Sequence, residues 1–209
     1  MSSGQKRRWE SLVTRSQLAT IGNGIFGIGA GDTIIPLQAR MMPHALCYFE
    51  DPYFVCRVRR GGPDEQWCSI LTMENTYGPG AYEWKAKAES PGQFKQHWLG
   101  GFERRHGFLR EGIIGFWIYQ GTYKVVTYWD GIGKETVLSR QDWTVERRFK
   151  VVWSLAAVRF YVYGVAVAVH TQGIPQGPMN FFLEAGRQGG ITTDGAFMLL
   201  RMDSFTKLA

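Results

Sequence analysis

The 209-residue chain lacks any apolar run of about 18 residues, the length that a helix needs to span a bilayer. Its longest apolar candidate, residues 151–169, is interrupted by Ser154, Arg159 and Gly164. Residues 1–15 are polar and basic, and no apolar stretch follows them. The sequence therefore predicts neither a transmembrane segment nor a secretory signal. The expected location is the cytoplasm or a virion, with export by another route left open.

Cysteine and histidine are scarce, with three cysteines and four histidines in the chain. No two cysteines form a Cys-x-x-Cys pair, and the histidines lack metal-ligand spacing, which argues against a zinc site. Cys47 and Cys56 are placed where they could bridge two neighbouring strands, but with Cys68 the odd total leaves at least one thiol unpaired. We favour the interpretation that the thiols are reduced core residues.

Acidic residues are fewer than basic ones: 18 Asp and Glu against 24 Lys and Arg give a net charge of +6 and a pI near 9.3. Such a balance can attract phosphates or acidic polymers through its long-range field. The alternative, which we favour, is a solvated surface that keeps the protein soluble. The basic residues form only small, separated clusters, at residues 6–8, 57–60, 104–105 and 147–150.

Aromatic residues and glycine are abundant, at 14% of the chain and 26 residues respectively. Many turns combined with many aromatic side chains are typical of short strands. The clearest strand follows a turn at 78–80, with Tyr82 and Trp84 on one face and Glu83 and Lys85 on the other. Further strands are predicted at 53–58, 67–73, 113–120, 123–129, 135–139, 148–153, 158–162, 165–169, 181–185 and 196–205.

This series of short strands predicts an all-β protein, a two-sheet antiparallel sandwich or barrel. Residues 6–19 have apolar residues at helical spacing and predict one short helix. The glycine-rich stretch 21–38 favours loops and short strands. We expect residues 1–45 to form an irregular N-terminal arm or edge strands, and residues 46–209 to form the sandwich.

Three segments resemble the concanavalin A-like lectin/glucanase superfamily, which includes laminin-G-like modules and family-16 glucanases. They are YGPGAYEWKAK at residues 77–87, the hairpin FKVVW and VRFYVYGVAVA within 149–168, and IPQGPMNFFL at 174–183. The resemblance covers about residues 66–206 and implies a jelly-roll sandwich. Patterns of packing and turns specify the fold and say little about function.

The resemblance also allows a test for catalysis. Family-16 glucanases carry a Glu-x-Asp-x-Glu or Glu-x-Asp-x-x-Glu motif on one strand, which supplies the two carboxylates of retaining hydrolysis. The corresponding stretch here, GIIGFWIYQ at residues 112–120, contains no carboxylate. The resemblance therefore implies no glucanase-type catalytic residues, and we expect a protein that is not an enzyme of that type. Laminin-G-like relatives often bind calcium at turns, but no Asp-x-Asp cluster supports a calcium site, or any other cofactor, here.

A mixed aromatic and polar sheet face suits glycan binding, because sugar C–H faces stack on rings while hydroxyl groups need polar partners. The alternative is that each ring is covered by a loop, the partner sheet or another subunit. The candidate ligand-binding residues are Trp117, Tyr119, Tyr128, Arg159, Tyr161 and Tyr163.

Other charged positions are weaker candidates. The segment at residues 102–107 contains Glu103, two arginines and His106, and could support acid–base chemistry, but we interpret it as a charged turn. Asp32, Asp130, Asp194 and Asp203 lie beside turns and suit Asx-turn roles. Arginines interleaved with aromatic residues are also used to hold single-stranded nucleic acid, but no recognition motif is present, so nucleic acid is not an expected partner.

Three hypotheses of function follow. The first is a non-catalytic, lectin-like module that binds a glycan or polysaccharide. The second is a structural or assembly protein on a jelly-roll fold, such as a virion or filament subunit, with a homo-oligomer as its product. The third is a divergent glycoside hydrolase that uses carboxylates outside the family motif, such as Glu83 or Glu103.

Overall fold

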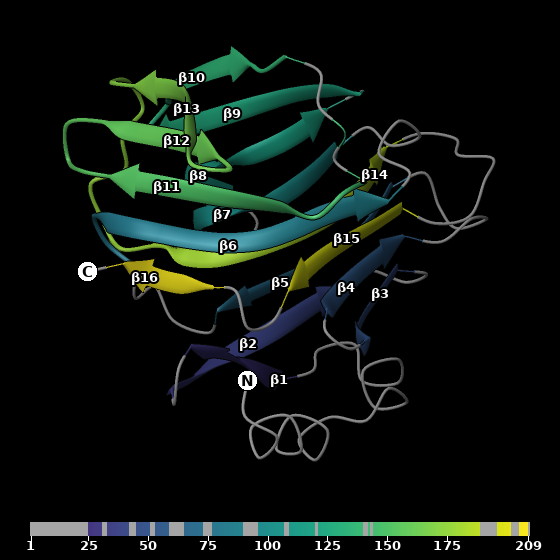
Figure 1. The fold of residues 1–209 in the computed structure, drawn as a ribbon. Coiled ribbons are helices and arrows are strands. Elements are labelled where there is room, and N and C mark those ends of the chain that lie inside the picture. The colour runs from purple at the N-terminus through teal and green to yellow at the C-terminus, as the bar shows by residue number, and fades with distance from the viewer. Residues whose placement is uncertain are drawn as a thin grey trace.

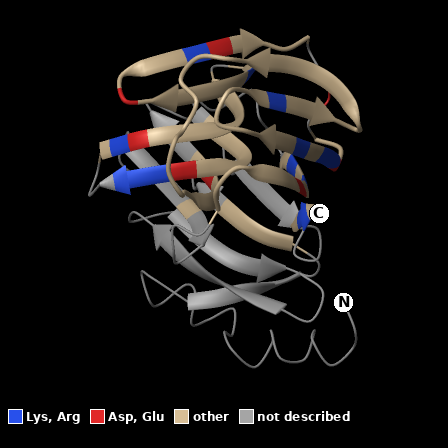
Figure 2. Cartoon of the chain, turned by 90° about the vertical axis from the view of Figure 1, so that its left-hand side faces the viewer, with Lys and Arg blue, Asp and Glu red and all other residues tan. Residues whose placement is uncertain are grey.

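The computed structural model describes the chain in thirteen segments, and every regular element among them is a β-strand (Figure 1). The strands pair antiparallel throughout and form two sheets. Figure 2, turned by 90° from that view, shows where the charged residues fall along the strands. The described residues are 25–30, 33–41, 45–50, 53–58, 65–72, 77–89, 96–106, 109–119, 121–139, 142, 144–188, 196–201 and 205–208.

The first sheet, sheet A, collects strands from both ends of the chain. Its central strand pair joins β14 to β7, far apart in sequence, and three consecutive hairpin-linked strands continue from β7 to β10. In spatial order its strands are β1 (Ile25–Ala30), β2 (Thr33–Met41), β5 (Glu65–Thr72), β14 (Asn180–Gln188), β7 (Gln96–His106), β8 (Leu109–Tyr119), β9 (Thr122–Trp129) and β10 (Ile132–Val137).

The second sheet, sheet B, lies over sheet A and is centred on β6 and β11 (Figure 1). The short β16 (Thr206–Leu208) pairs with β6 beside the main path. In spatial order the other strands are β13 (Val165–His170), β12 (Val158–Val162), β11 (Arg147–Trp153), β6 (Gly80–Glu89), β15 (Ala196–Arg201), β4 (Tyr53–Val58) and β3 (Ala45–Glu50). This is the two-layer antiparallel jelly-roll sandwich that the sequence predicts.

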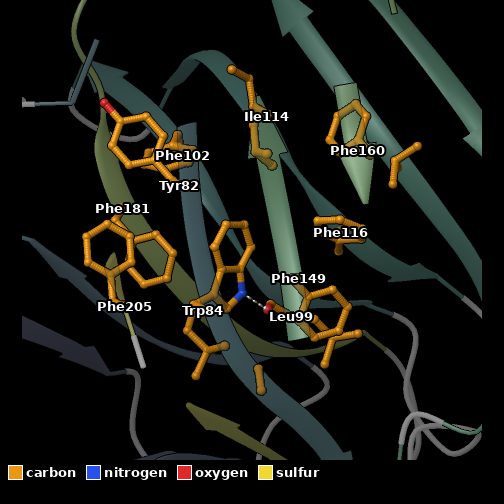
Figure 3. Packing of buried hydrophobic residues seen from close by; sticks show 14 of the residues in the cluster. Tyr82, Trp84, Leu99, Phe102, Ile114, Phe116, Phe149, Phe160, Phe181 and Phe205 are labelled. Atoms are coloured by element: carbon orange, nitrogen blue, oxygen red, sulfur yellow. Dashed lines mark hydrogen bonds between the residues drawn. The ribbon is translucent and has the colours of Figure 1, made fainter. Parts of the chain in front are cut away.

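The core lies between the two sheets and is rich in aromatic side chains (Figure 3). On β6 the predicted alternation is confirmed: Tyr82 and Trp84 are fully buried, while Glu83 and Lys85 point away and are half-buried. The Trp84 ring packs on Phe149 and Phe116, and its Nε1 donates a hydrogen bond of 2.8 Å to the Leu99 carbonyl. A buried indole that keeps its hydrogen bond adds packing without a desolvation cost.

Two of the predicted hairpins close with the same tight turn. Asp130 and Gly131, between β9 and β10, have φ values of 49° and 78°, and Tyr163 and Gly164, between β12 and β13, have 52° and 79°. Two consecutive residues with positive φ are typical of the type I′ turn, whose twist matches that of the strands it joins. The strand boundaries on either side therefore agree with the sequence to within a few residues.

The N-terminal region is only partly described. The predicted helix at residues 6–19 and the turn residues Asp32, Asp194 and Asp203 lie outside the described residues. Within the glycine-rich stretch, β1 and β2 form a hairpin, and β2 pairs with β5 at the side of sheet A. The division of the chain near residue 45 stays a prediction. Within the described part of the chain, no helix is long and apolar enough to cross a membrane.

Candidate functional site

The aromatic residues predicted on β8 and β9 share one face of sheet A, the outer face, which points away from sheet B. On β8, Ile114, Phe116 and Ile118 enter the core, so Trp117 and Tyr119 project outward. On β9 the outward position opposite Ile113 is Tyr128, which packs in a small second cluster. That cluster consists of Trp98, Ile113, Val126 and Phe182, with Trp117 and Tyr128 at its margin.

The other three predicted residues lie on the opposite side of the molecule. Val158, Phe160 and Val162 of β12 are buried in the core, so the residues between them, Arg159 and Tyr161, point outward from sheet B. Tyr163 follows in the exposed turn after β12. The six predicted residues therefore divide between two outer faces and do not form one site.

On the outer face of sheet A, two indoles form a stack with a cation at each end. The rings of Trp98 and Trp117 lie 5.2 Å apart and are tilted by only 6°. The Arg110 guanidinium lies 5.3 Å from the Trp98 ring, and the Lys124 ammonium lies 5.3 Å from the Trp117 ring. Lys124 also lies 5.6 Å from the Tyr119 ring. Cations over ring faces are attracted by the ring quadrupole, so this column holds the aromatic rings in fixed positions.

The exposed end of this column carries polar groups. Lys124 is held by Glu135 of β10 at 2.6 Å, and the Glu135 side chain is 45% exposed. Trp117 and Tyr119 are half-buried, with ring centroids 4.9 Å apart, whereas Trp98 is 3% exposed. Among the described residues, the Nε1 groups of Trp98 and Trp117 have no hydrogen-bond acceptor. The accessible part is thus a short aromatic shelf beside a lysine and a carboxylate.

The inner end of the column rests on four charged residues, which we call the quartet: Glu103 and Arg105 of β7, Arg110 of β8 and Glu184 of β14. Arg105 Nε lies 2.7 Å from Glu103 Oε1, and its Nη2 donates to Glu184 Oε2 at 2.8 Å. Arg110 Nε donates to Glu103 Oε2 at 2.9 Å, and its Nη2 donates to Glu184 Oε2 at 3.2 Å. Each arginine therefore binds both glutamates.

The two glutamates of the quartet are buried, its two arginines are half-buried, and the four charges sum to zero. Glu103 is 1% exposed and Glu184 6%. Burial opposes the charge of Arg105, but attraction to Glu103 and Glu184 outweighs it, so the pKa of this guanidinium is raised. Both carboxylates act as hydrogen-bond acceptors, an arrangement that positions Arg110 against the rings of Trp98 and Phe182.

The interpretation of residues 102–107 as a charged turn is wrong for its described part. Residues 102–106 belong to β7, with Glu103 opposite Asn180 and Ile113 in the neighbouring strands. The β7 alternation is broken by a register shift between Trp98 and Gly101, which hides the strand in the sequence. Gly100 within it has φ +108°, and an added Cβ would lie 2.3 Å from Trp84 Nε1, so the irregularity is tied to the core tryptophan.

The outer face of sheet B has a different character. Its tyrosines are covered by cations of the same face: the Lys150 ammonium lies 5.6 Å from the Tyr161 ring, and the Arg147 guanidinium lies 5.1 Å from the Tyr163 ring. Tyr163 also donates its hydroxyl to the Glu146 carbonyl at 2.5 Å. Arg159 is exposed on the same side. Cations lie over both tyrosine rings, so a ligand on this face would meet mainly positively charged groups.

Neither face gathers a metal site among the described residues, where no three His, Cys, Asp or Glu side chains come together. The two glutamates named as hydrolase candidates lie apart, since Glu83 is on the outer face of sheet B and Glu103 on that of sheet A. Cys47 and Cys56 are opposite each other in the register of β3 and β4.

No protein-family model matches the chain, and no curated protein matches its sequence. Solved structures do match its fold. The laminarinase catalytic domain from Thermotoga maritima has a TM-score of 0.59 and 17% identity, over 78% of this chain and 81% of that one. The Bacillus licheniformis β-glucanase has a TM-score of 0.58 and 15% identity, over 90% of this chain and all (100%) of that one.

A third structure comes from work on endo-acting O-glycanases that human gut bacteria use to begin mucin breakdown. It has a TM-score of 0.59 and 14% identity, over 80% of this chain and 83% of that one. Identities this low establish the fold alone. The predicted resemblance is confirmed at that level: the chain has the concanavalin A-like jelly-roll fold that these glycan-degrading enzymes share.

Proposed function

We propose that the protein is a non-catalytic carbohydrate-binding module whose glycan lies on the outer face of sheet A. The observation that carries this proposal is the shelf of Trp117 and Tyr119 beside Lys124 and Glu135. Because Trp98 and Lys124 cover the two faces of the Trp117 ring, a sugar ring would lie against Tyr119 and the edge of Trp117, while its hydroxyl groups would bond to the ammonium and the carboxylate. The names of the structural neighbours, a laminarinase and a glucanase, support a ligand of this class.

The chemistry of the buried carboxylates supports binding rather than hydrolysis. Retaining hydrolysis needs one carboxylate as nucleophile and a second that can donate a proton to the leaving group. Glu103 and Glu184 each form ion pairs with two arginines. Glu111, the nearby carboxylate on β8, is 3.0 Å from Arg104 and 41% exposed. All three carboxylates are paired with arginines, and this pairing supports the proposal of binding.

The test is a glycan array followed by calorimetric titration with the neutral oligosaccharides that bind. Trp117→Ala removes half of the shelf, and we expect it to weaken binding by about fivefold or more, because about 1 kcal/mol of aromatic contact is lost. The matched control is Tyr161→Ala on the other face, which should change the Kd by less than about twofold.

Two results would contradict the proposal. One is the absence of any oligosaccharide that binds more tightly than about millimolar. The other is turnover of a β-glucan by the wild-type protein, which would make the chain a divergent hydrolase. In that case Glu103→Gln and Glu83→Gln would identify which face carries the reaction.

A second candidate function is assembly into an oligomer, because both sheets end in strands that expose apolar side chains. Sheet A ends at β10 with Ile132 and Val137 exposed, and sheet B ends at β13 with Val165 and Val169 exposed. Unpaired edge strands with apolar side chains can pair with another chain. Light scattering after size exclusion tests it: a regular oligomer that Val165→Lys dissociates would support assembly, and a monomer at high concentration would exclude it.

A further inference from the structure

The outer face of sheet B carries a band of positive charge that the proposed glycan site does not use. On β6, β11 and β12 the inward positions are filled by core residues such as Trp84, Phe149 and Phe160, so the intervening positions all point outward. In the described part of these three strands, the charged outward positions are Glu83, Lys85, Lys87, Glu89, Arg148, Lys150 and Arg159.

Five of these seven residues are cations, and three of the five, Arg148, Lys150 and Arg159, lie together on β11 and β12. Glu83 is 3.9 Å from Arg148, and the two side chains are 28% and 47% exposed. An ion pair that is long and solvated contributes almost nothing and leaves both charges available to a ligand. Arg148, Lys150 and Arg159 outnumber the acid that is paired with them, so this part of the band presents an excess of positive charge.

Sheet geometry fixes the spacing of the cations. Successive outward residues of one strand lie about 7 Å apart, and neighbouring strands lie about 5 Å apart. Lys150 is opposite Glu83 and Tyr161, and Arg148 is opposite Lys85, so the cations occupy adjacent rows on three neighbouring strands. A linear polymer with an anionic group on each unit or every second unit would meet one cation after another on crossing these rows.

The surroundings of the tyrosines on this face indicate whether it suits a nucleic acid or an acidic polysaccharide. Single-stranded nucleic acid is held by bases that stack on open aromatic rings. Here the Tyr161 ring lies under Lys150 and the Tyr53 ring under Lys87, so neither ring is open for a base. The described elements of this face are strands, so none of them is a helix that could enter a duplex groove. A ligand recognised by its charges alone fits this surface better.

We propose that the outer face of sheet B, along β6, β11 and β12, binds a linear acidic polysaccharide, a chain of sugars that bear carboxylate or sulfate groups. This surface is separate from the aromatic shelf on sheet A and does not depend on what the shelf binds. Its binding energy is electrostatic, so added salt weakens it.

The experiment is a titration of the whole chain with polygalacturonate and with dextran sulfate, with uncharged dextran as the matched polymer. Binding of the two acidic polymers should weaken by about tenfold or more between about 50 mM and about 200 mM salt, and dextran should not bind. Arg159→Glu and Lys150→Glu should each weaken binding by about tenfold or more. The control is Lys134→Glu, an exposed β10 residue, which makes the same change in net charge away from the band and should have an effect of less than about twofold.

Three outcomes overturn the proposal. They are no binding of either acidic polymer, equal weakening by Lys134→Glu, and tighter binding of oligo-dT than of a polysaccharide with the same number of charges. Thermal unfolding of each variant shows that its fold is intact. The Kd of a neutral oligosaccharide is measured for the same variants, and Arg159→Glu should leave it unchanged. This control distinguishes a failure of the present proposal from a failure of the proposed glycan site on sheet A.

Discussion

The two outer faces of the sandwich share the alternation of their strand residues, but they differ in how their charged residues are paired. On both, every second strand residue points away from the core, and both faces carry aromatic rings capped by cations. On sheet A two arginines pair with two buried glutamates from neighbouring strands and form a neutral quartet. On sheet B, Arg148 lies 3.9 Å from Glu83, and both side chains stay partly in solvent. The register of neighbouring strands decides whether a charge becomes structural or stays available to a ligand.

The largest effect that we expect is on stability, when a glutamate of each face is replaced by glutamine. Glu103→Gln leaves Arg105 and Arg110 with one carboxylate in a buried setting, which should lower the free energy of unfolding by about 3–5 kcal/mol. Glu83→Gln removes a half-buried charge 3.9 Å from its partner and should cost less than about 0.5 kcal/mol.

Urea denaturation of the two variants and the wild type measures both values. A Glu103→Gln protein as stable as Glu83→Gln would show that the quartet does not hold the outer face of sheet A. The buried charge of Glu103 would then contribute no more to stability than the solvated charge of Glu83.

A smaller effect concerns the seam between the sheets, which neither outer face touches. His170 of β13 is buried, with Nδ1 2.9 Å from Thr127 Oγ1 and Nε2 2.9 Å from Thr136 Oγ1. Burial, with a smaller contribution from Lys134, lowers its pKa from 6.5 to about 4. The unfolded chain therefore binds a proton at this residue before the folded one does. Stability that is complete above pH 6.5 should fall by up to about 3 kcal/mol as the pH drops through about 4.

The measurement is urea denaturation at several pH values, with His170→Gln as the comparison. His97, whose pKa burial lowers to about 3, adds a loss of the same sign in both proteins. We expect His170→Gln to be less stable at neutral pH and to show a shallower fall between pH 6.5 and 4. If the stability of the two proteins changed with pH in parallel, His170 would not contribute to the loss of stability at low pH.

The sequence predicts much of the fold, because alternation and turn chemistry are local properties. The β6 strand, the hairpin of β12 and β13, and the Asp130–Gly131 turn all follow from residues close together in the chain. The strand β7 does not follow, because its bulge at Gly100 and Gly101 breaks the alternation that reveals a strand. A charged segment next to such a break is easily interpreted as a turn.

The candidate site is less predictable, because it depends on contacts between distant strands. Alternation predicts that Trp117 and Tyr161 both point away from the core. The two residues lie in different sheets, however, and therefore on opposite faces of the molecule. The quartet joins Glu103 of β7 to Glu184 of β14 through two arginines, and no local pattern signals that contact. Trp98 was missed for the same reason as its strand, although it is the ring on which Trp117 stacks.

The central claim is that the protein has two independent binding faces, an aromatic shelf for a neutral glycan and a basic band for an acidic one. The most direct test is to titrate a neutral oligosaccharide into the protein alone and into the protein saturated with polygalacturonate. The account predicts that both ligands bind together, with a Kd for the oligosaccharide that changes by less than about twofold. Loss of oligosaccharide binding in the presence of the acidic polymer would show that both ligands use one face and would contradict the account.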